Sequence, residues 1–272
     1  MILPLPWVLM RLMAVHAHPD DESGKGAATT ARYAAEGAEV LVVTCTGGER
    51  GEVLNPRMDT PEVRANLPEI RRREMTTARE ILGVRQRFLG FADSGMREPL
   101  PPGCFARVSS DLAVARLVAV IREFRPQVMV TYDETGGYPH PDHIKTHEVA
   151  VAAFDAVAGT SHEISKLYYL CTFTREWFQA MHDALGPESP MEPVLAELPD
   201  TPSKITTRIR CEEFFAARDR ALLAHATQID PESGFMLHSR DVERVVWPTE
   251  DYYLARSFVP VELPEDDLFA GL

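Results

Sequence analysis

The chain has 272 residues, of which 45% are hydrophobic and 25% are charged, the proportions of an ordinary soluble globular protein. Its 28 basic and 41 acidic residues give a net charge of -13, and such a surface repels nucleic-acid phosphates and anionic membranes. The composition therefore excludes nucleic acid and membrane as default partners and favours a small-molecule substrate. It does not determine an oligomeric state.

Residues 1–11 are apolar and include Pro4 and Pro6, so we expect a loose N-terminal lead-in to the first strand. No basic segment precedes this stretch, and it is too short to cross a bilayer, so we expect neither a signal peptide nor a membrane span. The four cysteines are far apart and form no CxxC pair, which indicates reduced thiols and a cytoplasmic protein. We expect residues 1–272 to form a single domain.

Strands and helices alternate along the first half of the chain. We expect strands at 12–17, 40–44, 88–91 and 128–132, and helices at 24–36, 69–82, 112–124 and 143–157. This alternation predicts a three-layer α/β fold with a mostly parallel, Rossmann-like sheet, whose ligands bind at the carboxyl ends of the strands. The second half is less regular, with a strand expected at 166–173, a helix at 211–224 and a Pro-rich loop or lid at 186–203.

Two short motifs rich in metal ligands follow predicted strands: His-Pro-Asp-Asp at 18–21 and His-Pro-Asp-His at 140–143. His18, Asp21 and His143 can supply imidazole nitrogen and carboxylate oxygen to zinc and leave one position open for water, as in catalytic zinc sites. We therefore predict a metal site at the strand C-terminal ends.

Two other histidines lie close to these motifs in the sequence. His16 precedes His18 on the same strand face, and His147 follows His143 by one helical turn, a spacing that also suits a zinc pair. We expect both to support the site as packed neighbours rather than to bind the metal.

The same motifs supply groups for amide hydrolysis. Asp20 lies beside Asp21 and can take a proton from the attacking water as a general base. His140 can donate to the developing oxyanion if it is protonated, and the nearby Asp142 would hold it charged and oriented. Tyr138 can add one hydrogen bond.

These motifs resemble the signatures of the LmbE-like, or PIG-L, N-deacetylases, and the resemblance runs along nearly the whole chain. The longer stretches 14–23, 46–51, 138–144, 225–231 and 247–250 are most similar to the amidase branch of that family, which hydrolyses mycothiol S-conjugates. The resemblance implies an LmbE-like fold and a zinc-dependent amidase, with Fe²⁺ as an alternative metal.

The resemblance also assigns residues. It implies that His18, Asp21 and His143 bind zinc, and it gives Asp20, His140, Asp142 and Tyr138 the roles described above. The resemblance further implies that Arg71 and Asp93 bind the glucosamine-inositol part of the substrate and that Lys25 marks the amidase branch. Lys25 begins a predicted helix just beyond the metal ligands, so we also expect its ammonium to bind the acyl side of the substrate through the cysteinyl amide oxygen. Arg71 is the first of three consecutive arginines, which leaves its register open.

The function that follows is hydrolysis of the amide bond of mycothiol S-conjugates, which yields a mercapturic acid and glucosaminyl-inositol and serves thiol detoxification. One alternative is the deacetylation of N-acetylglucosaminyl-inositol in mycothiol synthesis. Another is a natural-product amidase that cleaves a mycothiol adduct, because 163–207 departs from the amidase pattern and is placed to contact the S-linked group. A nucleotide-binding sheet without hydrolysis is disfavoured, because the first strand is not followed by Gly-x-Gly-x-x-Gly.

Overall fold

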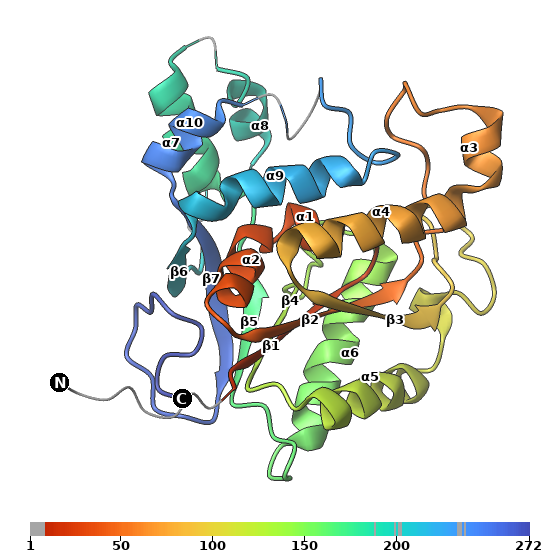
Figure 1. The fold of residues 1–272 in the computed structure, drawn as a ribbon, viewed down its shortest axis with the longest axis vertical. Coiled ribbons are helices and arrows are strands. Elements are labelled where there is room, and N and C mark those ends of the chain that lie inside the picture. The colour runs from red at the N-terminus through yellow and green to blue at the C-terminus, as the bar shows by residue number, and fades with distance from the viewer. Residues whose placement is uncertain (1–8, 188, 199, 201–202, 233–235, 237) are drawn as a thin grey trace.

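The computed structural model describes residues 9–187, 189–198, 200, 203–232, 236 and 238–272 (Figure 1). Residues 1–8, which make up most of the expected lead-in, lie outside the described residues. The first strand begins at Arg11, so the lead-in ends one residue earlier than the sequence predicted.

A seven-stranded sheet in the order β3-β2-β1-β4-β5-β7-β6 forms the middle layer. The first five strands in chain order are parallel to one another, whereas β7 runs antiparallel to both β5 and β6. Parallel strands covered on both faces need apolar side chains on both faces, and β4 is accordingly buried along its whole length. The strands are β1 (Arg11–His16), β2 (Glu39–Thr46), β3 (Arg85–Phe91), β4 (Val128–Thr131), β5 (Lys166–Leu170), β6 (Thr207–Arg210) and β7 (Thr249–Ser257).

Helices cover both faces of this sheet, so the predicted three-layer α/β fold is confirmed. Helices α2, α4 and α9 pack on one another on one face, and α5 packs on α6 on the other (Figure 1). Helices α7, α8 and α10 form a lobe beside them, which we call the α7–α8 lobe. The helices are α1 (Asp21–Gly24), α2 (Ala27–Ala35), α3 (Pro61–Ala65), α4 (Leu67–Leu82), α5 (Ser110–Phe124), α6 (Pro141–Val157), α7 (Arg175–Leu185), α8 (Glu192–Glu197), α9 (Phe215–Ala224) and α10 (Arg240–Val246).

Three of the expected segments differ clearly from the sequence prediction, the expected helix 211–224 begins only at Phe215, and strands β6 and β7 were not predicted. The expected helix 24–36 is interrupted at Gly26, whose φ of 82° lies in the left-handed region that favours glycine. The expected strand 166–173 ends at Leu170, and Phe173 has a φ of 55° that turns the chain away from the sheet. The Pro-rich stretch 186–203 contains α8, and its residues 188, 199 and 201–202 lie outside the described residues.

The order of the strands reverses direction between β1 and β4, which are neighbours in the sheet although β2 and β3 separate them in the sequence. At such a switch point the loops that follow the two strands diverge and leave a crevice at the carboxyl edge. Both His-Pro-Asp motifs follow strands that end at this crevice.

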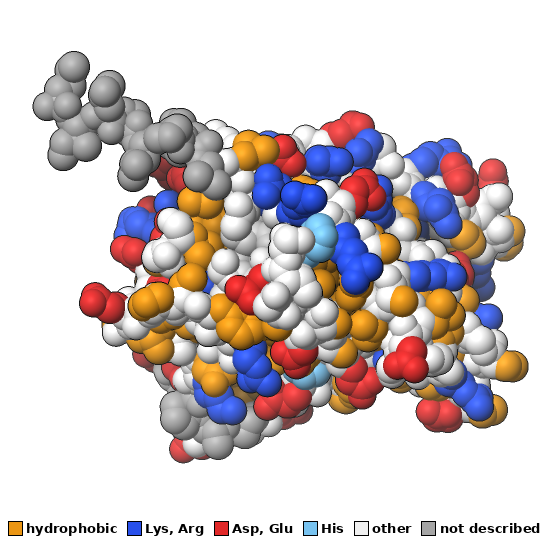
Figure 2. All heavy atoms as spheres, turned by 90° about the horizontal axis from the view of Figure 1, so that it is seen from below, with side chains coloured by type: hydrophobic (Ala, Val, Ile, Leu, Met, Phe, Trp, Pro, Cys, Tyr) orange, Lys and Arg blue, Asp and Glu red, His pale blue; other side chains and the backbone are white. Residues whose placement is uncertain are grey.

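On the face seen from below in Figure 1, basic and acidic side chains are interspersed rather than gathered into a patch of one sign (Figure 2). Exposed ion pairs also join charges of opposite sign on the surface, for example Arg87 and Glu123, 2.6 Å apart. Within the described part of the chain, no helix combines the length and the apolar character that a membrane span needs.

Candidate active site

The two motifs meet at the β1–β4 crevice. His143 Nε2 lies 3.3 Å from Asp21 Oδ2, and His18 Nδ1 lies 3.4 Å from the same oxygen. All three side chains are buried. The segment after β1 and the first turn of α6 thus bring His18 and Asp21 together with His143, which lies more than a hundred positions later in the sequence.

These atoms form a group that can hold a metal ion, because one potential ligand atom from each residue lies within 4.8 Å of the others. A second group of this kind consists of His18, His140 and Asp142 and shares His18 with the first. The described residues therefore offer two overlapping triads around one imidazole.

The hydrogen bonds of His143 fit the residue to a metal. Its Nδ1 donates to the carbonyl oxygen of Gly136 at 2.9 Å, so the lone pair of the neutral ring lies on Nε2. Nε2 is buried and makes no hydrogen bond, although it faces the carboxylate of Asp21. A lone pair that faces a carboxylate is repelled unless a cation lies between them, so the donor set suits a cation.

The charges around His18 also indicate that the site suits a cation. Burial alone would lower the pKa of this imidazole, but the nearby carboxylates of Asp142, Asp21 and Asp93 raise it well above its ordinary value. Several carboxylates that converge on one ring in a buried site create an excess of negative charge. A bound cation would relieve this excess.

The backbone near His143 leaves no room for larger residues. A Cβ on Gly136 would lie 2.6 Å from the Cβ of His143, and Gly136 has a φ of 76°. On the opposite side, the Tyr132 ring stacks on the imidazole with 4.4 Å between centroids and 8° between planes. Tyr132 was predicted only as the end of a strand, and its role in fixing the ring could be recognised only in three dimensions.

Asp20 has an unusual backbone conformation. Its φ of 116° is rare for a residue with a side chain, and such strain is often found at functional sites. The carboxylate accepts a hydrogen bond from Arg71 Nη2 at 2.9 Å. Burial and the neighbouring Asp21 raise the pKa of Asp20, while the Arg71 guanidinium opposes this rise.

Arg71 is buried, whereas Arg72 and Arg73 are exposed, so Arg71 is the one of the three arginines that reaches the site. Its guanidinium also donates to the carbonyl oxygens of Gly48 and Pro19, at 2.8 and 2.5 Å. A Cβ at Gly48 would overlap the guanidinium. Arg71 thus lies buried behind Asp20, whereas the resemblance implied that its side chain binds the sugar part of the substrate.

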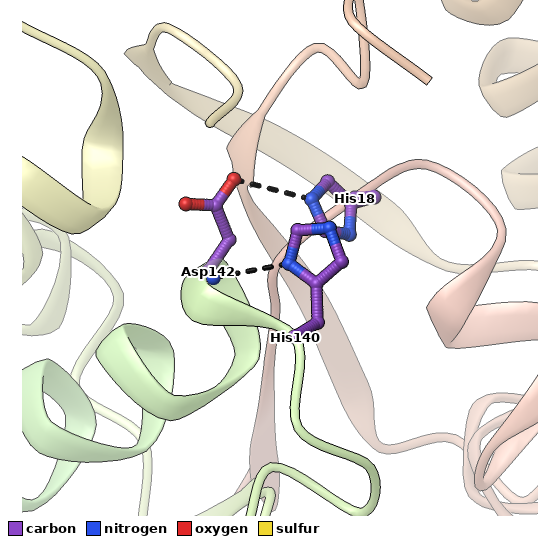
Figure 3. Close-up of side chains that lie close together, drawn as sticks. All are labelled: His18, His140 and Asp142. Carbon is purple, nitrogen blue, oxygen red and sulfur yellow. Dashed lines mark hydrogen bonds and ion pairs between the residues drawn. The ribbon is translucent and has the colours of Figure 1, made fainter. Parts of the chain in front are cut away.

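His140 is held differently from the sequence expectation. It is the N-cap residue of α6, and its Nδ1 accepts a hydrogen bond from the main-chain nitrogen of Asp142 at 3.0 Å (Figure 3). The carboxylate of Asp142 points instead to His18 Nε2 at 3.3 Å and binds the Ser94 amide and hydroxyl. This corrects the prediction that the Asp142 carboxylate orients His140, because the ring caps its own helix.

Electrostatics also disfavour a charged His140. Burial, with His18 and His143 nearby, lowers the pKa of His140 to about 4. The ring is therefore neutral at pH 7. Because Nδ1 is the acceptor, the proton of the neutral ring lies on Nε2.

Two further predicted residues line the crevice. Tyr138 is 46% exposed, and its ring contacts that of His143 edge-on, with 4.5 Å between centroids. Lys25 Nζ lies 2.6 Å from Asp21 Oδ1 and 5.6 Å from the centroid of the Tyr138 ring. Lys25 thus holds the oxygen of Asp21 that does not face the two histidines.

Asp93 lies on the opposite side of His18, with 3.7 Å between Asp93 Oδ1 and His18 Nε2. Its carboxylate accepts hydrogen bonds from the main-chain nitrogens of Arg50 and Gly95, at 2.9 and 2.8 Å. Although burial raises the pKa of Asp93, the nearby His18 imidazole and these hydrogen bonds lower it below its usual range. Asp93 therefore remains a carboxylate beside the histidines.

The two other histidines lie outside both triads. His147 Nδ1 donates to the carbonyl oxygen of Tyr132 at 3.0 Å, and its ring contacts that of Tyr169. His16 is buried edge-on against Tyr132, and burial lowers its pKa to about 4. Both residues accordingly occupy the packed positions expected for them.

Sequence reasoning assigned no role to a buried pair that supports Asp20. His225, at the end of α9, lies 2.8 Å from Glu22, and both side chains are buried. Glu22 also accepts a hydrogen bond from the main-chain nitrogen of Asp20 at 2.9 Å. His225 begins one of the stretches that carry the resemblance, which was the available signal.

Known proteins are similar to this chain in sequence and in fold. The sequence model of the PIG-L family, described as GlcNAc-PI de-N-acetylase, matches residues 13–154. The mycothiol S-conjugate amidase of Streptomyces coelicolor is 53% identical, and the alignment covers 97% of each chain.

A second relative is the 1D-myo-inositol 2-acetamido-2-deoxy-alpha-D-glucopyranoside deacetylase of Geodermatophilus obscurus. It is 42% identical, over 96% of this chain and 98% of that protein. Among solved structures, the N,N'-diacetylchitobiose deacetylase of Pyrococcus horikoshii has the same fold, with a TM-score of 0.62 at 17% identity over 90% of this chain and 83% of that one. The matches extend along nearly the whole sequence, and the chain belongs to the PIG-L family of LmbE-like N-deacetylases.

Proposed function

We propose that this protein is a zinc-dependent amidase that hydrolyses the glucosaminyl amide of mycothiol S-conjugates and releases a mercapturic acid and glucosaminyl-inositol. Membership of the family makes the chain a hydrolase of non-peptide amide bonds. The observation that carries the substrate assignment is the 53% identity to a mycothiol S-conjugate amidase over 97% of each chain. The deacetylase from Geodermatophilus obscurus is 42% identical.

His18, Asp21 and His143 would hold the zinc ion, and the orphaned Nε2 of His143 supports this set. When bound, zinc would polarise the amide carbonyl and lower the pKa of a water molecule to about 7. Fe²⁺ suits the same imidazole and carboxylate donors, so metal replacement belongs in the test below.

Asp20 would take the proton of the attacking water as the new C–O bond forms. Arg71 holds the Asp20 carboxylate through Oδ2, and Asp20 lines the crevice. When the C–N bond breaks, the protonated Asp20 would return that proton to the leaving amine. One carboxyl group thus serves as base and then as acid, and no proton is left over.

His140 would stabilise the oxyanion that forms on the carbonyl oxygen. The main-chain nitrogen of Asp142 binds Nδ1, so the neutral ring carries its proton on Nε2 and can donate without being charged. This differs from our expectation of a protonated ring and agrees with its lowered pKa of about 4. Tyr138 is partly exposed at the same crevice and would add a second donor.

The runner-up function is deacetylation of N-acetylglucosaminyl-inositol, which needs the same groups and a smaller acyl pocket. The family resemblance assigns Asp93 to the sugar part in either case, although its carboxylate is buried and bonded to the main-chain nitrogens of Arg50 and Gly95. The crevice that contains Asp20 and Lys25 opens into a cavity of about 1020 Å³, which favours an acyl group larger than acetyl. An amidase that cleaves a mycothiol adduct in a natural-product pathway would use the same cavity.

Lys25 offers a way to separate the two branches. Its ammonium lines the cavity beside Asp21 and can reach the cysteinyl amide oxygen, which an acetyl group lacks. We expect Lys25→Ala to lose more kcat/KM on the conjugate than on the acetylated precursor. Equal losses on both would mean that Lys25 serves only to hold Asp21.

The four cysteines are free thiols, which supports a cytoplasmic location, and the small-molecule substrate leaves no role for nucleic acid or membrane. The decisive experiment is steady-state kinetics of one preparation, reconstituted with zinc or with Fe²⁺, on a bimane conjugate of mycothiol and on N-acetylglucosaminyl-inositol. We expect a higher kcat/KM on the conjugate. A preference for the acetylated precursor would identify a deacetylase instead.

A further inference from the structure

The cavity of about 1020 Å³ joins the candidate active site to the α7–α8 lobe. One end is polar and contains Asp20, Asp21 and Lys25. The other end is formed by the turn after β5 and by helices α7 and α8. A ligand whose carbonyl lies at the polar end can therefore extend its acyl part along the α7–α8 lobe.

Three aromatic side chains of this lobe contact one another in the cavity wall. The ring centroids of Trp177 and Phe178 are 4.9 Å apart with planes at 89°, and those of Phe173 and Trp177 are 5.9 Å apart at 86°. The Phe173 and Phe178 centroids are separated by 6.3 Å. Such edge-to-face contacts fix the rings as a preformed surface. We call these three residues the aromatic wall.

The local chain conformation builds this wall. Phe173 has a φ of 55°, which is costly for a residue with a side chain and turns the chain from β5 into α7. Thr174 then caps α7 by accepting the main-chain N–H of Trp177 at 3.3 Å. The turn places Phe173, which precedes α7, beside Trp177 and Phe178 of that helix. Strained residues often occur at functional sites, so the strain at Phe173 supports a functional role of the aromatic wall.

Helix α8 and its flanks also contribute Met191, Val194 and Leu198 to the cavity lining. Val194 is 38% exposed, and Leu198 is partly exposed. The described residues from 173 to 198 that line the cavity are all uncharged. This end of the cavity thus suits an apolar group that contacts aromatic rings and aliphatic side chains, and burial of that group would be favourable.

We infer that the aromatic wall and α8 form the subsite for the S-substituent and select flat, uncharged aromatic substituents. The inference rests on the proposed amidase function. In an S-conjugated N-acetylcysteinyl group, three single bonds separate the carbonyl carbon from the sulfur, so the substituent must lie beside the reacting carbonyl rather than at it. The aromatic wall lies in that direction along the same cavity.

The test compares two conjugates that share the mycothiol part, one with a bicyclic bimane and one with S-methyl. We expect the wild-type enzyme to favour the bimane conjugate. Phe178→Ala and Val194→Asp should each reduce the ratio of kcat/KM between the two conjugates about tenfold, mainly through KM. Val194 is partly exposed, so Val194→Asp provides the test if Phe178→Ala does not fold.

Phe258→Ala is the matched control, because Phe258 is 48% exposed and stacks on Phe154 outside the cavity lining. It should leave both rates unchanged. Calorimetry with N-acetyl-S-bimane-cysteine, the product, should show weaker binding to both cavity variants and unchanged binding to the control.

Two results would overturn the inference and are distinguishable. If the wild type hydrolyses both conjugates equally well, or if the variants leave their ratio unchanged, the subsite assignment is wrong and the amidase function stands. If the wild type hydrolyses neither conjugate but deacetylates N-acetylglucosaminyl-inositol, the proposed function fails and the inference fails with it.

Discussion

His143 Nε2 lies 3.3 Å from Asp21 Oδ2, and no hydrogen bond joins the two atoms. The imidazole is fixed from behind by its bond to Gly136 and from the side by the Tyr132 ring. Two acceptors held face to face in a buried site are stable together when a cation separates them.

From this relationship we predict that His143→Ala lowers zinc affinity by more than about 100-fold, because it removes one of three protein ligands. Bound zinc per chain, measured by mass spectrometry after dialysis against a metal buffer, checks this. The control is His147→Ala, one turn further along α6, which should keep full zinc content. Normal zinc binding by His143→Ala would remove this residue from the ligand set.

Asp20→Asn should keep zinc and lower kcat by about 10² to 10⁴-fold, the usual contribution of a general acid–base group. The amide is nearly isosteric and can still accept from Arg71, but it cannot take a proton. Zinc content and turnover should be measured on the same sample. Near wild-type turnover in a fully metallated variant would assign the base to another group.

Arg71→Met should lower kcat about 10- to 100-fold and retain zinc, since the Asp20 carboxylate loses the group that orients it. The contact with Asp20 is 2.9 Å and is buried on the arginine side. Arg73→Met, an exposed neighbour on the same helix, is the matched control and should have wild-type kinetics. If Arg71→Met instead raises KM for the sugar and leaves kcat intact, the substrate-binding role implied by the family resemblance is the better description.

The stability of the α7–α8 lobe should depend on pH through Glu243. Burial alone would raise the pKa of this carboxyl, but hydrogen bonds from His238 and Arg218 lower it from 4.5 to about 2. A lowered pKa in the folded state stabilises the protein at pH values above 4.5, and this stabilisation is lost as the pH falls from 4.5 towards 2. The contribution at neutral pH is up to about 3 kcal/mol.

Urea unfolding of wild type and Glu243→Gln at pH 7, 4 and 3 tests this. The free energy of unfolding of the wild type should fall more steeply with acid, so that the two proteins approach each other at low pH. Glu123→Gln, which breaks an exposed ion pair with Arg87, should retain the wild-type acid slope because solvent screens that pair. Parallel curves for wild type and Glu243→Gln would show that Glu243 does not control the acid response.

The sequence by itself determined the layers of this protein and the family to which it belongs. Apolar and β-branched runs such as 40–44 can be buried only as strands between helices, and the ligand-rich motifs at 18–21 and 140–143 each follow such a strand. A parallel sheet places the carboxyl ends of its strands at one edge, so the proximity of the two motifs followed from the pattern alone.

Tertiary structure decided the contacts within that edge. Sequence spacing could not distinguish Arg71 from its two neighbours, because only the helix orientation buries one of them behind Asp20. Nor could it show that the Asp142 main chain, rather than its carboxylate, orients His140, since helix capping depends on where α6 begins. The aromatic wall depends on the left-handed turn at Phe173. Because no glycine stands at this position, the sequence gives no sign of the turn, and its strained conformation must be held by the surrounding structure.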